Sequence, residues 1–135
     1  MLKGHASWAT SVLLILVLGH SPAYANYGER WDFLGQTHID GAQDHGNILV
    51  ERRDGTFRAL RMRVSEDGAI FLERAVVHYV DGSTEEVIIH DRILAGSQTP
   101  TIDLPGVPRV IESVHLWYFK AVWEHQPKVI LFGRR

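Results

Sequence analysis

The sequence predicts an all-β protein, an antiparallel β-sandwich or jelly roll of seven or eight strands. Three observations support this fold class. Apolar and polar residues alternate over short stretches, and Gly, Pro, Asn and Asp residues separate these stretches. No stretch of about a dozen residues keeps the 3.6-residue period of an amphipathic helix. Without helices to cover a parallel sheet, an antiparallel arrangement is favoured.

The clearest strand is expected over Arg58–Val64. Leu60, Met62 and Val64 alternate there with two arginines, which is typical of a strand with one face on the core and one in water. A turn at Asp54-Gly55 precedes it. Shorter strands are expected at Trp31–Leu34, Ile48–Val50, Ile102–Leu104 and Val129–Phe132.

Two longer strands are expected at Ala69–Val80 and Arg109–Lys120. Both carry apolar residues on their two faces, at least in part. A central or two-sheet strand, with a β-bulge in the first of them, explains this pattern.

A hairpin is expected where Asp81-Gly82 separates Val76–Val80 from Glu86–Ile89, because an Asp-Gly pair between two apolar runs is a strong hairpin signal. With Ser83 and Thr84 also in the turn, Val80 would face Glu85.

That register decides whether the histidines of the hairpin can meet. It places His78 opposite Val87 and Tyr79 opposite Glu86, and therefore keeps His78 away from His90. A joint metal site of these two histidines is not expected. His78 and His115 are interpreted as polar positions within apolar strands.

Residues 1–25 have the composition of a cleaved signal peptide. Lys3 is their only charge, Val12–Leu18 is an apolar run, Pro22 follows it, and Ala23-Tyr24-Ala25 provides the small residues of a cleavage site. Gly19 and the residues after it end the apolar run well before the roughly 20 residues of a membrane span. We therefore expect cleavage after Ala25 and an exported product, periplasmic or extracellular, that is not inserted in the membrane.

The mature chain, Asn26–Arg135, is expected to form a single β-sandwich domain. Cleavage removes one of 14 basic residues and none of 16 acidic residues, so the net charge moves from −2 to about −3. This balance disfavours nucleic acid as a partner. The absence of Cys excludes disulfides, thiolate metal sites and a catalytic thiol.

Several short motifs, taken in order, resemble a family of short exported bacterial proteins of unknown function. The most distinctive are the Asp103–Gly106 turn followed by Arg109–Ile111, and the closing Phe132–Arg135. The resemblance spans nearly all of the mature chain and implies export and a compact β fold, with no activity attached. The remaining motifs are Trp31–Gly35, Asp40 with Asp44-His45, Gly55–Arg58 and Asp91–Ile93.

An aromatic segment near the C-terminus is the main candidate binding surface. Trp117, Tyr118, Phe119 and Trp123 fall within seven residues. Alternation places Tyr118 on one face and Trp117 with Phe119 on the other. One set belongs to the core; the other, with Trp123, would form a flat platform for a sugar or a partner chain. Burial of both sets in a central strand is the alternative.

A second candidate site is the loop that holds His38, Asp40, Asp44 and His45. Its carboxylates and imidazoles are possible ligands of a divalent cation. The alternative is that both aspartates cap turns at the neighbouring glycines.

The leading hypothesis is an exported, non-enzymatic binding or interaction module of the cell envelope, whose partner is an envelope protein or a glycan. No cofactor is expected, apart from a divalent cation in the second candidate site. The alternatives are a small metal-dependent or hydrolytic periplasmic protein that uses the Asp40–His45 loop, and a purely structural envelope protein. No serine has the Gly-x-Ser-x-Gly pattern of a nucleophile elbow.

Overall fold

All regular structure in the described part of the chain is β-strand. The computed structural model describes residues 30–39, 45–50, 55–120 and 126–135. The expected signal peptide, residues 1–25, lies outside these ranges. The strands are β1 (Asp32–His38), β2 (His45–Leu49), β3 (Ala59–Val64), β4 (Ile70–Tyr79), β5 (Thr84–Ile93), β6 (Ile102–Asp103), β7 (Ile111–Lys120) and β8 (Lys128–Arg134).

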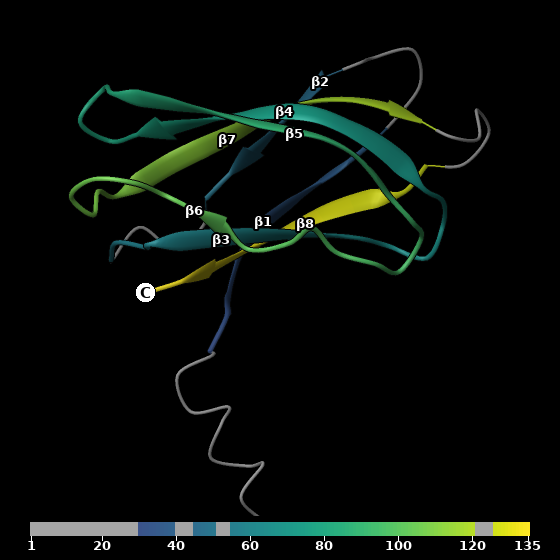
Figure 1. Ribbon diagram of the computed structural model, residues 1–135, viewed down its shortest axis with the longest axis horizontal. Coiled ribbons are helices and arrows are strands. Elements are labelled where there is room, and N and C mark those ends of the chain that lie inside the picture. Colours follow the sequence, from purple (N-terminus) through teal and green to yellow (C-terminus); the bar gives the residue numbers. More distant parts are fainter. Residues whose placement is uncertain (1–29, 40–44, 51–54, 121–125) are drawn as a thin grey trace, which may run out of the picture. The chain divides into compact units, whose positions relative to one another are not determined.

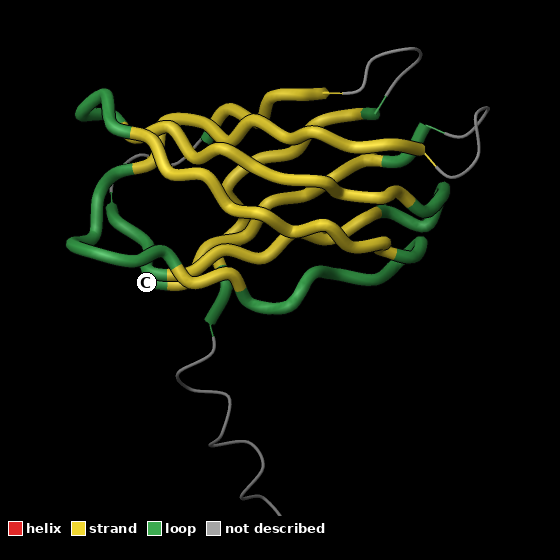
Figure 2. The backbone as a smooth tube through the Cα atoms, turned by 45° about the horizontal axis from the view of Figure 1, so that its top comes forward, coloured by secondary structure: helices red, strands yellow, loops and turns green. Residues whose placement is uncertain are grey.

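These strands form two four-stranded antiparallel sheets that pack as a sandwich. Sheet A has the order β1-β8-β3-β6, and sheet B has the order β2-β7-β4-β5. Figure 1 shows the two layers one above the other, and Figure 2 shows that strands make up most of the described chain. The predicted fold class is thereby confirmed. Among the described strands, the β4-β5 hairpin alone joins sequence neighbours within one sheet, and all other successive strands lie in different sheets.

The core lies between the sheets and is built from alternate residues of the strands. Leu60, Met62 and Val64 of β3 are buried as predicted. Val114, Leu116 and the Tyr118 ring of β7 are buried as well. Because successive side chains point to opposite faces, the residues between them face solvent on the outer side of each sheet.

Glycines leave room for close contacts at two places in the sandwich. A Cβ atom on Gly133 of β8 would lie 2.7 Å from Cδ1 of Leu34, and one on Gly35 of β1 would lie 2.5 Å from the carbonyl oxygen of Leu49 in β2. Residues without a side chain are therefore needed where β1 meets β2 and where β8 meets the core.

The β4-β5 hairpin is present, but its predicted register is wrong by three residues. His78 lies opposite Thr84, rather than Val87. The turn is tighter than expected because Gly82 has a φ of +92° and the Ser83 N–H donates to Oδ1 of Asp81. The Tyr79 N–H then donates to the Ser83 carbonyl and closes the loop. His78 and His90 are still far from opposite each other.

The expected bulge in β4 is present at Glu73, because Leu72 and Arg74 pair with the successive residues Tyr118 and Trp117 of β7. The β4-β5 pairing is irregular at the same place. The β4-β5 register shifts between Leu72 and Arg74, so that Ile89 and His90 of β5 together face Glu73. His90 has a φ of +46°, in the left-handed region. The extra residue re-aims the side chains of β5 at this point.

Candidate functional site

The aromatic residues of β7 lie on both sides of sheet B. Tyr118 is buried in the core, whereas Trp117 is half-buried on the outer face and Phe119 is 57% exposed there. Trp123 lies outside the described residues. The outer face of sheet B therefore holds two of the three predicted binding aromatics.

Trp117 is the middle of a three-residue stack. It lies opposite His45 of β2 on one side and opposite Arg74 of β4 on the other. The His45 ring stacks on it with a centroid distance of 5.6 Å and an interplanar angle of 21°, and Cζ of Arg74 lies 3.8 Å from the ring centroid. Since β2 and β4 flank β7, both faces of the indole are covered. Trp117 is therefore part of a stack, and the predicted platform, which also includes Trp123 outside the described residues, stays a prediction.

Arg74 is held in place from its other side. Its Nη1 forms an ion pair with Oε2 of Glu86 at 3.1 Å, and both side chains are partly exposed. This ion pair holds the guanidinium over the Trp117 ring.

Two further histidines lie beside this stack. The His115 ring of β7 is 6.4 Å from Trp117 and only 4.4 Å from the His78 ring of β4, centroid to centroid. Partial burial, followed by the charges of His78 and His45, lowers the pKa of His115. His115 therefore favours the neutral form more strongly than an isolated histidine does.

A second aromatic group lies at the other end of β7. Phe71 of β4 packs near Phe119, with ring centroids 6.4 Å apart, and contacts His90 edge-on at 5.1 Å. Nδ1 of His90 also lies 3.6 Å from a carboxylate oxygen of Glu73. We call this outer surface of sheet B the histidine–aromatic face; it comprises His45, Phe71, Arg74, His78, His90, His115, Trp117 and Phe119.

Only part of this face can be predicted from the sequence. His78 and His115 are polar positions within apolar strands, as predicted, and the β4-β7 pairing brings the two side chains together. The sequence does show that residues 115, 117 and 119 alternate along one strand, so their side chains are expected on the same face of the sheet. The partner strands could not be assigned without the sheet order.

The second predicted site is only partly within the described residues. His38 is exposed on β1 of sheet A, and His45 is on β2 of sheet B against Trp117. Asp40 and Asp44 lie outside the described residues, so cation binding by this loop stays a prediction. Within the described ranges, no group of three or more His, Cys, Asp or Glu side chains is placed to hold a metal ion.

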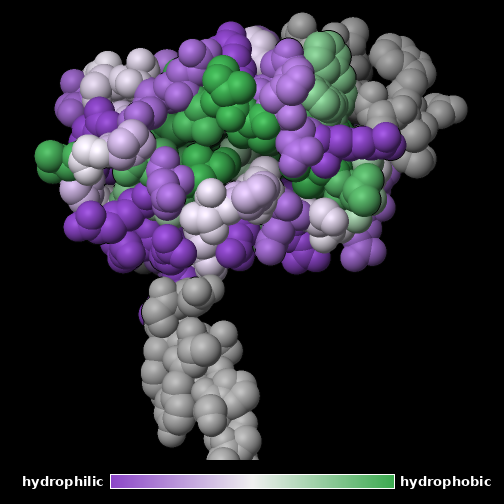
Figure 3. Space-filling view, viewed as in Figure 1, coloured by the Kyte–Doolittle hydropathy of each residue, from purple (hydrophilic) through white to green (hydrophobic). Residues whose placement is uncertain are grey.

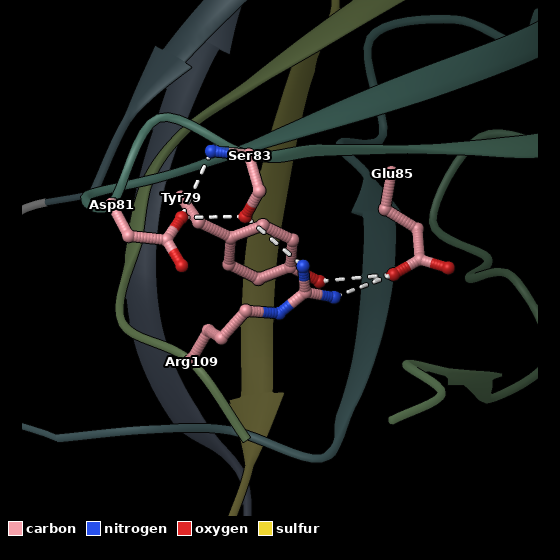
Figure 4. A network of polar contacts seen from close by, with 5 residues as sticks. All are labelled: Tyr79, Asp81, Ser83, Glu85 and Arg109. Atoms are coloured by element: carbon pink, nitrogen blue, oxygen red, sulfur yellow. Dashed lines mark hydrogen bonds and ion pairs between the residues drawn. The ribbon is translucent and has the colours of Figure 1, made fainter. Parts of the chain in front are cut away.

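A polar network lies at the β4-β5 turn, at one end of sheet B (Figure 4). The Arg109 guanidinium lies 3.8 Å from the Tyr79 ring centroid and donates to Ser83 Oγ at 3.0 Å and to Glu85 Oε1 at 2.9 Å. Burial is the main cause that raises the pKa of Tyr79, whose hydroxyl donates to Glu85. With these partners engaged, the network anchors the β4-β5 hairpin to the segment before β7.

A cleft with a mixed apolar and polar lining opens between the edge strands β5 and β6. Its volume is about 340 Å³, and Val87, Ile89 and Ile102 are among its lining residues, with Asp91 and Asp103 also lining it. Figure 3 shows hydrophobic side chains gathered in a band between polar margins on this side of the molecule. The cleft therefore lies at one edge of the sandwich, where the edge strand of sheet B meets that of sheet A.

The comparison with protein families decides the membership of the chain. The family described as a domain of unknown function, DUF2541, matches residues 10–133. The chain belongs to this family. The match confirms the resemblance found in the motifs and assigns no activity. No curated protein matches the sequence.

Two solved structures are distantly similar to the DUF2541 chain. The first is AlgX from Pseudomonas aeruginosa, with a TM-score of 0.49 and 10% identity over 82% of this chain. The chain spans only 28% of AlgX. The second is a mutant of the family 29 carbohydrate-binding module CBM29-2, with a TM-score of 0.34 and 14% identity over 79% of this chain and 74% of the module.

Among the described residues, no helix is long and apolar enough to cross a membrane.

Proposed function

We propose that this DUF2541 protein is an exported, non-enzymatic binding module whose histidine–aromatic face takes a glycan. The observation that carries the proposal is the exposed Phe119 ring beside the prebuilt stack of His45, Trp117 and Arg74. Phe119 offers an open apolar surface, and the stack offers polar groups that are already fixed in position.

The exposed apolar area on this face supports a binding role. Leu49 and Ile88 lie in register with the outward residues of β7 and β4, and they are 61% and 67% exposed. With Phe119, they give one sheet face three large apolar side chains in solvent. Leu49 pairs with Ser113, toward the opposite end of β7 from Phe119, so these apolar side chains are spread along the face among its polar groups.

The polar groups favour a glycan over a large protein interface. A sugar ring presents an apolar surface of C–H groups and a rim of hydroxyls, which suits aromatic surface next to forked donors and carboxylates. Arg74 and Glu86 supply one donor and one acceptor at the centre of the face. The centre of a protein interface is, in contrast, usually depleted of charged side chains.

The sheet makes this surface rigid before any ligand arrives. Trp117 and Arg74 are on the two central strands, β7 and β4, and contact each other across the register. Binding then orders few side chains, which lowers its entropic cost.

The decisive experiment measures binding of the purified protein to an array of bacterial envelope glycans, followed by titration of each hit. We expect Phe119→Ala to weaken binding by about 10- to 30-fold, as for a central aromatic contact. Val107→Ala is the matched control, because Val107 is 78% exposed in the loop between β6 and β7 and should leave affinity unchanged.

Two results would overturn the glycan proposal. One is unchanged affinity of Phe119→Ala for every glycan that the wild-type protein binds. The other is the absence of any glycan hit while an envelope protein binds the same face, with binding lost in Phe119→Ala but kept in Val107→Ala. Thermal melting of both variants verifies that they are folded.

The proposed export depends on residues 1–25, where an apolar run precedes a small-residue cleavage site. Expression of the full chain with a C-terminal tag, fractionation and N-terminal sequencing test it. We expect a periplasmic or secreted product that begins at Asn26. A cytoplasmic product that retains Met1–Ala25 would contradict export.

A further inference from the structure

We propose that His78 and His115 form a chelating site for a divalent transition-metal ion, with Cu²⁺ bound most tightly. The two imidazoles come from neighbouring strands, β4 and β7, and their ring centroids are 4.4 Å apart. The site lies on the histidine–aromatic face but does not depend on the glycan proposal.

The ring separation matches what a shared metal ion requires. Metal–nitrogen bonds to imidazole are about 2.0–2.1 Å long, which places the metal roughly 3.2 Å from each ring centroid. At nitrogen–metal–nitrogen angles of about 90° to 109°, the two centroids would lie about 4.5 to 5.2 Å apart. The observed 4.4 Å lies just below this range, so a slight rotation of the rings is needed to share a metal ion. The final torsion of a histidine is broad, so each ring can turn a nitrogen toward the metal at little cost.

The strands fix the two histidines as a pair. His115 lies opposite Val76 in the β4-β7 register, and His78 lies opposite Ser113, so the two are diagonal neighbours on the same face. Both strands are central in sheet B and are hydrogen-bonded on both sides. The metal therefore meets a preformed pair of ligands.

The other two histidines of the face have different contacts. His45 stacks on Trp117, and His90 packs against Phe71 and lies near Glu73. Since the described residues hold no group of three or more suitable side chains, the protein supplies two ligands and water completes the coordination. Imidazole pairs suit Cu²⁺, Ni²⁺ and Zn²⁺, and the general affinity order puts Cu²⁺ first.

Calorimetric titration of the purified protein with CuCl₂, NiCl₂ and ZnCl₂ tests the site. We expect one equivalent of Cu²⁺ to bind, and His78→Gln or His115→Gln to weaken binding on the order of 100-fold, because a chelate becomes a single-point contact. His90→Gln is the matched control and should keep wild-type affinity. Bound Cu²⁺ should also raise the thermal midpoint of the wild-type protein but not of the two site variants.

Several results would overturn the proposal. These are unchanged affinity in both site variants, equal weakening in His90→Gln, or weak binding of several equivalents. If a site variant does not fold, NMR of the wild-type protein provides the test: Cu²⁺ must broaden the His78 and His115 resonances first, and broadening centred elsewhere contradicts the site. Glycan binding is measured in the absence of metal, so either proposal can fail while the other stands.

Discussion

The two outer faces of the sandwich each carry a tryptophan stacked with cationic side chains, but the kind of cation differs. On sheet A, Cζ of Arg61 lies 4.1 Å from the Trp31 ring centroid and Cζ of Arg134 lies 5.1 Å from it. On sheet B, Trp117 has one arginine and one histidine. Arginine stays charged at any physiological pH, whereas histidine loses its charge near neutrality. The sheet A stack therefore contains only arginines, whereas the sheet B stack combines an arginine with an imidazole.

The remaining residues of the two faces follow the same division. Arg63 and Lys128 also lie on outward positions of sheet A, where His38 is the one histidine in the described strands. Sheet B holds four histidines on its outer face and has Glu73 and Glu86 among them. Aromatic surface alone does not distinguish the faces, since Phe33 and Phe132 pair on sheet A. The two faces differ instead in their titratable side chains, because the histidines are concentrated on sheet B.

The largest expected effect comes from removing the tryptophan in the middle of the sheet B stack. Trp117→Ala should lower the free energy of unfolding by about 2 kcal/mol, because His45 and Arg74 both lose their packing partner. Trp31→Ala should cost about 1 kcal/mol, since Trp31 precedes β1 rather than lying within a central strand. Urea denaturation of both variants measures the difference. Equal losses would mean that the two stacks support the fold to the same extent.

A smaller effect should separate the faces by pH. The pKa of His115 is lowered in the folded chain, so the folded protein binds this proton more weakly than the unfolded chain does. The resulting stability is present above the unfolded pKa of about 6.5 and is lost as pH falls through the lower folded value. The free energy of unfolding should therefore fall more between about pH 7.5 and about pH 5 in the wild-type protein than in His115→Gln.

Arg61→Gln on sheet A is the control for this pH dependence. It removes a stacked cation whose charge does not change over the same range, so the pH slope of stability should equal that of the wild-type protein. If His115→Gln keeps the wild-type slope, or Arg61→Gln loses it, the titratable character does not belong to sheet B.

The fold could be predicted from local patterns, whereas the composition of the faces could not. Alternation in Arg58–Val64 and the Asp81-Gly82 turn each depend on a few adjacent residues, and both features are present. The hairpin register was missed because it depends on the Asp81 side chain and the left-handed Gly82, which tighten the turn. Such details are not visible in the hydrophobic pattern.

The histidine–aromatic face was missed for a different reason. His45, His78 and His115 come from three strands that are far apart in sequence, and only the β2-β7 and β4-β7 pairings make them neighbours. Parity on one strand predicts which residues share a face, but it does not say which strand lies next to it. A candidate site built across strands therefore needs the sheet order.

The smallest expected effect concerns the planarity of the stacked arginines. Arg74→Lys and Arg61→Lys keep the charge, but they replace a flat guanidinium against an indole with a compact ammonium. Each should cost about 0.5 kcal/mol of unfolding free energy, the size of an exposed cation–π contact. Arg63→Lys, on the exposed outer side of β3, is the control and should be neutral.

Fluorescence quenching tests the same contact. In Arg74→Lys one indole face of Trp117 opens to solvent, so the fluorescence of Trp117 should be quenched more strongly by iodide. If Arg74→Lys does not raise the quenching, Arg74 is not what limits access to the Trp117 ring.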